Sequence, residues 1–113
     1  MAKDDYHIIV YKILAYLYTQ LKNGESIDKK CISNDGILFH INYRYWTYII
    51  KNMQEQGYIR GVTITTPWGS GDIVENIEQC EITPLEIEYL CSNSFMKKAK
   101  KILKESKEIT PFI

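Results

Sequence analysis

Three features of the 113-residue sequence predict an α+β fold in which helices precede and follow one β-hairpin. In the first half of the chain, apolar residues recur at three- and four-residue spacing, as on the buried face of a helix. Residues 62–72 then read as an alternating strand followed by a turn with one proline and two glycines. Helical patterns return after residue 83. Three helices, a two-stranded wing and two C-terminal helices are the order of a winged helix-turn-helix.

The composition indicates one folded domain over residues 1–113. A chain of this length is near the commonest single-domain size. Its 45% hydrophobic and 25% charged residues are ordinary for a folded protein. The apolar stretch Ile8–Leu17 is interrupted by Lys12 and follows two acids, so it does not resemble a signal peptide. No run reaches the roughly 20 apolar residues that span a bilayer. We therefore expect a soluble cytoplasmic protein that does not bind a membrane.

The cysteines and histidines do not form a metal-binding pattern. Cys31, Cys80 and Cys91 are an odd number and include no C-x-x-C pair, which argues against a disulfide framework and a zinc site. His7 and His40 are too far apart in sequence to be a local ligand pair. We expect reduced, partly buried thiols, with no metal and no cofactor.

The first helix is predicted from residue 6 to Asn23. Asp4 or Asp5 can accept hydrogen bonds from its first N–H groups, and Asn23 with Gly24 supplies a left-handed C-terminus. One apolar stripe runs along it: Tyr6, Ile9, Val10, Ile13, Leu14, Leu17 and Leu21. A helix of two turns should follow, capped by Ser26 or Asp28. After the turn at residues 33–36, residues 36–40 form either a brief strand or an extended linker.

The third helix has the clearest pattern, and it should begin at Asn42 and end at Gly57. Its apolar stripe is Trp46, Ile49, Ile50 and Met53. The bulk of Trp46 should anchor the helix in the core. The opposite face carries Arg44, Thr47, Tyr48, Lys51, Gln54 and Glu55.

The return strand of the hairpin is ambiguous. Ile73 and Ile77 share one parity, whereas Cys80 and Ile82 share the other, so one unbroken strand cannot bury all four. Either a bulge intervenes, or only residues 79–82 pair and the residues before them form a loop or turn. The second interpretation is favoured.

Two helices are predicted after the hairpin. Thr83 should cap the first, with Pro84 at its first position and Glu86 placed to close a capping box. This helix should break at residues 92–93. The last helix, from about Ser94, carries six lysines, either beside the third helix or on an ordinary solvated face.

Several short motifs carry a family resemblance: Tyr45-Trp46, Ile49-Ile50, Gly57-Tyr58-Ile59 and the runs at residues 82–90 and 93–99. They resemble the YjcQ-type winged-helix proteins of low-GC Gram-positive bacteria and their prophages. The resemblance covers most of the chain. The family usually has a glycine near Glu86, and this departure suggests a different helix surface. The resemblance implies a winged-helix fold and a regulator or phage-encoded DNA-binding protein, and it brings no catalytic residues.

If the domain binds DNA, the third helix should enter the major groove. The candidate contacts are Asn42, Tyr43, Arg44, Thr47, Tyr48 and Lys51. Arg44 is best placed for a bidentate contact to guanine. The alternative is that these residues form a solvated helix face.

The charge pattern argues against DNA at the wing. Residues 61–92 contain six acids and no lysine or arginine, and phosphate contacts require cations. Trp68, between a proline and a glycine at the hairpin tip, either folds back over the hairpin or contacts a protein partner or a second copy. A protein-interaction module on the same scaffold is therefore the alternative to a DNA-binding protein. No recognisable nucleophile or phosphate-binding loop is present, and we expect no enzyme.

Overall fold

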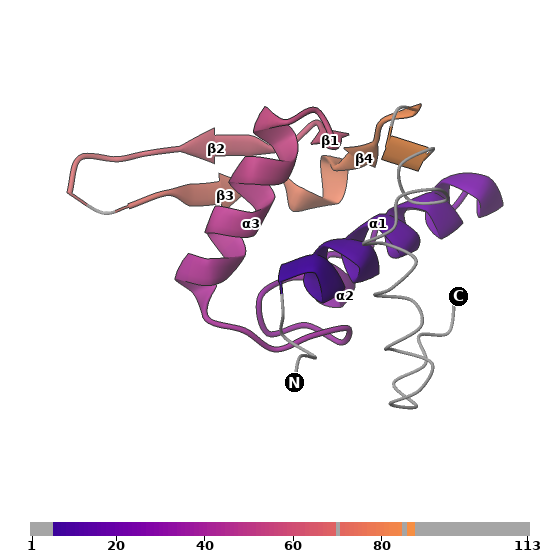
Figure 1. The fold of residues 1–113 in the computed structure, drawn as a ribbon, viewed down its shortest axis with the longest axis horizontal. Coiled ribbons are helices and arrows are strands. Elements are labelled where there is room, and N and C mark those ends of the chain that lie inside the picture. The colour runs from indigo at the N-terminus through magenta and orange to yellow at the C-terminus, as the bar shows by residue number, and fades with distance from the viewer. Residues whose placement is uncertain (1–5, 70, 85, 88–113) are drawn as a thin grey trace.

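The computed structural model describes residues 6–69, 71–84, 86 and 87, and shows an α+β fold (Figure 1). Three helices are followed by two small antiparallel sheets of two strands each, β1 with β4 and β2 with β3. The elements are α1 (Tyr6–Asn23), α2 (Lys29–Ile32), α3 (Tyr43–Glu55), β1 (Ile59–Arg60), β2 (Thr63–Thr65), β3 (Ile73–Glu75), the 3₁₀ helix η1 (Ile77–Gln79) and β4 (Glu81–Ile82). The predicted order of three helices and a hairpin is thus confirmed. The predicted last helix lies outside the described residues.

Helix α1 is the centre of the core. Every residue from Ile8 to Leu17 is buried, so this part of α1 is covered on all sides rather than along the single stripe that the sequence predicts. Lys12 lies within this run, and its ammonium donates to the Leu38 carbonyl at 2.9 Å. A buried lysine is tolerated because a backbone oxygen accepts a hydrogen bond from its ammonium. The helix ends at Asn23, before Gly24 with a φ of 69°, as predicted.

Between α1 and α3, the helix is shorter than the two turns that the sequence predicts. Helix α2 has four residues, and of the two predicted caps it uses Asp28, whose carboxylate accepts from the Lys30 N–H at 3.0 Å. Residues 36–40 are a linker rather than a strand, with one isolated bridge between Asp35 and His40. The linker closes over the core through Leu38 and other buried side chains.

Helix α3 begins and ends where the sequence predicts. Asn42 is its N-cap, with the side-chain oxygen accepting from the Arg44 N–H at 2.7 Å. The Trp46 ring is buried and its Nε1–H donates to the Ile32 carbonyl at 2.9 Å, which ties α3 to the end of α2. Trp46 therefore anchors the helix as expected. At the other end the chain turns through Gly57, which has a φ of 82°.

The hairpin is interrupted on its return side. Ile59 pairs with Ile82, and Thr63 with Glu75, so two residues separate the paired segments on the outward chain and five on the return chain. The helix η1 occupies the longer side and buries Ile77. The favoured interpretation, in which only residues 79–82 pair, is wrong, because β3 also pairs. The interruption changes the parity, so Ile77, Cys80 and Ile82 are all buried.

A glycine makes this interruption possible. Gly61 has a φ of 96°, and a Cβ atom there would lie 2.3 Å from the Gln79 carbonyl oxygen. Only glycine combines the left-handed conformation with so close an approach of η1.

The start of the next helix follows the prediction in part. Thr83 is its cap, since the Glu86 N–H donates to Thr83 Oγ1 at 3.3 Å. The capping box is not formed, because the Thr83 N–H donates to the Tyr58 carbonyl at 3.2 Å instead. Glu86 is buried, and its Oε1 has no hydrogen-bond partner among the residues that the structure describes. The Thr83 hydroxyl donates to the Gly57 carbonyl at 2.7 Å, so the cap also fastens the end of α3.

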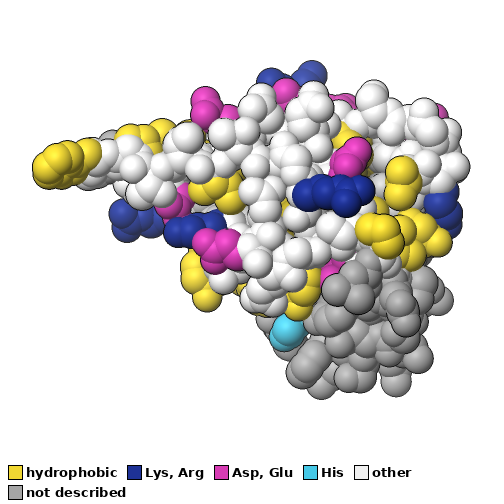
Figure 2. All heavy atoms as spheres, turned by 90° about the horizontal axis from the view of Figure 1, so that it is seen from above, with side chains coloured by type: hydrophobic (Ala, Val, Ile, Leu, Met, Phe, Trp, Pro, Cys, Tyr) yellow, Lys and Arg dark blue, Asp and Glu magenta, His cyan; other side chains and the backbone are white. Residues whose placement is uncertain are grey.

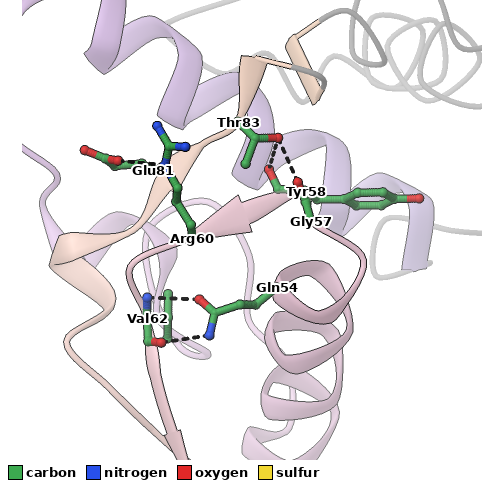
Figure 3. A network of polar contacts seen from close by, with 7 residues as sticks. All are labelled: Gln54, Gly57, Tyr58, Arg60, Val62, Glu81 and Thr83. Carbon is green, nitrogen blue, oxygen red and sulfur yellow. Dashed lines mark hydrogen bonds and ion pairs between the residues drawn. The ribbon is translucent and has the colours of Figure 1, made fainter.

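Gln54 joins α3 to the hairpin (Figure 3). Its amide nitrogen donates to the Val62 carbonyl at 2.8 Å, and its amide oxygen accepts from the Val62 N–H at 3.0 Å. Val62 lies at the interruption between β1 and β2, so its backbone groups have no partner across the hairpin. Gln54 was predicted on the exposed face of the helix. Its side chain instead forms the hydrogen bonds that the Val62 backbone lacks at this break in the ladder.

Replacing Gln54 with alanine should lower the free energy of unfolding by about 1–3 kcal/mol, because both Val62 groups lose their partner while Val62 stays buried. Urea denaturation followed by circular dichroism measures this. Gln56→Ala is the matched control, since Gln56 is exposed and lies two residues further along the chain. Equal losses in the two variants would contradict the role of Gln54.

Candidate functional site

A groove runs between the exposed face of α3 and the tip of the β2–β3 hairpin. Its lining includes four of the six predicted contact residues together with two residues of the hairpin: Arg44, Thr47, Tyr48, Lys51, Gly71 and Asp72. The sequence places the helix residues on one face, but it gives no indication that the hairpin folds against them. The structure therefore makes one surface from two separate segments.

Arg44 and Tyr48 are the freest of the predicted contacts. Both are exposed, Tyr48 by 58%. The Arg44 guanidinium lies over Gly71, at 3.9 Å from the position that a Cβ atom would take there. No carboxylate of the described residues forms an ion pair with Arg44. Its charge and its planar donors are available to a ligand in the groove.

Lys51 is already engaged with the hairpin. Its ammonium lies 3.4 Å from a carboxylate oxygen of Asp72. The Thr66 hydroxyl donates to the other oxygen of Asp72 at 2.6 Å. The hydrogen bond from Thr66, and then the charge of Lys51, lower the pKa of Asp72. This pair holds the hairpin tip against α3 and leaves Lys51 less free for a ligand than the sequence indicates.

The other predicted contacts are occupied by structural roles. Asn42 caps α3 with its side-chain oxygen. The Tyr43 hydroxyl accepts from the Val74 N–H at 3.5 Å, and its ring packs on Trp46 with 5.5 Å between centroids. Thr47 is not on the solvent face as predicted: it is 3% exposed, and its hydroxyl donates to the Arg44 carbonyl at 2.9 Å. Thr47 closes the floor of the groove, because the hairpin covers that side of α3.

The acidic segment is less repulsive to an anion than its sequence suggests. Asp72 is paired with Lys51, and Glu81 with Arg60 at 3.2 Å. Burial raises the pKa of Glu86 to about 7, so this carboxyl is partly neutral at pH 7. The sequence could not reveal these effects, since the compensating cations come from α3 and β1.

Trp68 lies at the hairpin tip and is fully exposed, with a relative accessibility of 101%. The interpretation that it folds back over the hairpin is wrong. Figure 2 shows why: the hairpin projects from the body as a narrow arm with hydrophobic side chains at its far end. Lysine and arginine side chains lie together with acidic side chains where this arm leaves the body.

A second hollow on the molecule was not predicted. It lies between the end of α1 and the β4 region and has apolar walls from Leu17, Leu21, Ile27 and Ile82. Periodicity places Leu21 on the core stripe, but the side chain is 58% exposed because no described element covers the last turn of α1.

Comparison with known families decides where the chain belongs. Residues 11–109 match the family described as YjcQ protein. The chain belongs to the YjcQ family. The match covers most of the sequence and confirms the resemblance. No curated protein and no solved structure matches this YjcQ protein.

Two further properties of the YjcQ protein concern its thiols and its helices. Cys31 and Cys80 are free cysteines, and burial raises the pKa of Cys80 to about 12; Cys91 lies outside the described residues. Within the part of the chain that the structure describes, no helix is long and apolar enough to cross a membrane.

The stability of this YjcQ protein should fall as the pH rises from about 4.5 to about 7, owing to Glu86. In that range the Glu86 carboxyl has released its proton in the unfolded protein, whereas it retains the proton in the folded protein. Glu86→Gln should remove a decline of up to about 3 kcal/mol, since the pKa rises from 4.5 to about 7 and one pKa unit corresponds to about 1.4 kcal/mol. Thermal unfolding of both proteins at pH 4.5 and pH 8 measures the difference.

The matched control is Glu78→Gln, which alters an exposed carboxyl of η1. It should shift stability equally at both pH values. The role of Glu86 is refuted if its variant behaves like the control.

Proposed function

We propose that this YjcQ protein binds double-stranded DNA as a winged helix, with α3 as the recognition helix and the β2–β3 hairpin as the wing. The observation that carries the proposal is the exposed Arg44 guanidinium, which has no ion pair within the described chain and lies between α3 and the hairpin. Arginine in this position can bind a phosphate or donate two hydrogen bonds to guanine.

The order and packing of the elements support the proposal. Three helices precede the hairpin, and α3 leads into it through Gly57. The exposed side of α3 near its N-terminus carries Arg44 and Tyr48, and recognition helices contact base edges with their N-terminal residues. Gln54 and the Lys51–Asp72 pair hold α3 and the hairpin together, so that both would reach the duplex in a fixed relation.

The charge of the wing is compatible with this role. Of the six acids, Asp72 and Glu81 each have a cation beside them, which reduces part of the repulsion. The two unpaired exposed acids of the described hairpin, Glu75 and Glu78, lie at its base rather than at its tip. The affinity should fall only gradually as the salt concentration rises, because few cations face the groove and the salt dependence scales with the number of phosphate contacts. The role that follows is a DNA-binding regulator of the cytoplasm, without catalysis.

One observation favours a second candidate function, a protein-interaction module. Exposed tryptophan is enriched at protein interfaces, and Trp68 is fully exposed. In that case the same scaffold would bind a protein partner or a second copy and not DNA. Failure to bind any duplex at low salt would favour this candidate.

Arg44→Ala should weaken binding to labelled random and AT-rich duplexes by at least about fivefold, because a charge-assisted contact is worth about 1–3 kcal/mol. Fluorescence anisotropy over a series of salt concentrations measures the affinity. Arg60→Ala is the matched control: Arg60, on β1, is also exposed but is paired with Glu81 of β4. Absence of binding at low salt, or equal losses for the two arginines, would overturn the proposal.

A further inference from the structure

Trp68 has a setting that a structural role does not explain. It follows Pro67 and precedes Gly69, which has a φ of 79°, so the chain turns sharply and directs the tip away from the body. The side chain is fully exposed and contributes nothing to the core. A ring of this size in water is costly unless a ligand covers it.

The residues around Trp68 are uncharged. From Thr65 to Gly71 the sequence contains no acid and no base, and the tip offers hydroxyl groups and exposed backbone. The first acid, Asp72, has its charge compensated by Lys51. Arg44 lies against Gly71, where the tip joins the groove. An anion can therefore approach an uncharged tip and meet Arg44 at Gly71, three residues along the chain from Trp68, although Glu55 also lines the groove.

A broad protein interface fits this arrangement poorly. A specific interface buries about 800 Å² on each partner, with its tryptophans near the centre of a packed patch. The other large hydrophobic side chains that are exposed in the described chain are Leu21, Ile37, Tyr43 and Tyr48, and none belongs to the tip. One isolated ring on a narrow arm matches a ligand with a single flat apolar face.

We propose that Trp68 stacks on the face of a DNA base next to the site contacted by α3. A surface that combines an exposed aromatic ring with a cation can bind unstacked bases, since the ring stacks on the base and the cation contacts the phosphate. This inference rests on the proposed function. The base is either unpaired, as in a mismatch or a single-stranded flank, or belongs to a flexible step that the tip opens as a wedge.

Two DNA duplexes distinguish an unpaired base from a base at a flexible step. Anisotropy titrations compare Trp68→Ala with wild type on a fully paired duplex rich in TA steps and on the same duplex with one unpaired base near its centre. Trp68→Ala should weaken binding about 5- to 150-fold on the DNA that supplies the base, as expected for one base–aromatic stack. Loss on both duplexes indicates a wedge, and loss on the second alone indicates an unpaired base; both outcomes support stacking.

Trp68→Phe is the matched control, because it retains a ring that can stack. It should retain most of the affinity. Intrinsic fluorescence gives a second readout: the wild-type signal should be quenched by DNA, whereas the Phe variant, which reports only the buried Trp46, should not. Both variants should unfold at the wild-type temperature, since the side chain is outside the core.

Unchanged affinity of Trp68→Ala on both duplexes, with Arg44-dependent binding intact, would overturn stacking and leave the proposed function standing. A dimer in sedimentation experiments that dissociates on Trp68→Ala, with DNA binding following the dimer, would also overturn it. Absence of binding by the wild type on every duplex would refute the proposed function itself.

Discussion

The pair of hydrogen bonds between the Gln54 side chain and the Val62 backbone is the contact on which the rest of the structure depends. The strands are only two or three residues long, and a two-stranded hairpin is marginal by itself. The ladder is also interrupted at Val62, where its backbone groups would be unsatisfied. One amide from α3 satisfies both groups and fixes the direction in which the hairpin leaves the helix.

Other contacts also join α3 to the hairpin. Tyr43 meets Val74, and Lys51 meets Asp72 near the tip. Thr83 fastens the returning chain to the end of α3 through the Gly57 carbonyl. Together these contacts place the exposed arginine of α3 beside the hairpin, so the candidate site exists only in the folded arrangement of both. An acidic hairpin then becomes compatible with an anionic ligand, because the Asp72 carboxylate forms an ion pair with Lys51 of α3.

Local sequence signals predicted the bounds of α1 and α3 well, and they did so for physical reasons. The stripe of Trp46, Ile49, Ile50 and Met53 has the helical period, and the Asn42 cap and Gly57 mark its ends. From the sequence, the return strand showed only a conflict of parity between its apolar residues. The sequence could not show that the strand is divided into β3 and β4, since the register depends on how closely η1 approaches Gly61. For the candidate site, the sequence found Arg44 and Tyr48 but placed Thr47 and Gln54 in solvent. Their positions are set by the hairpin, which is distant in the chain, and no periodicity encodes it.

The central claim is that α3 and the hairpin tip form one DNA-binding surface. Titrating the ¹⁵N-labelled protein with a duplex at low salt tests it most directly, through the backbone amide shifts. The account predicts shifts that cluster at Arg44, Tyr48 and the tip glycines Gly69 and Gly71, with little change around Leu21 and Ile27 in the apolar hollow. Shifts confined to that hollow, or no shifts at all, would contradict it.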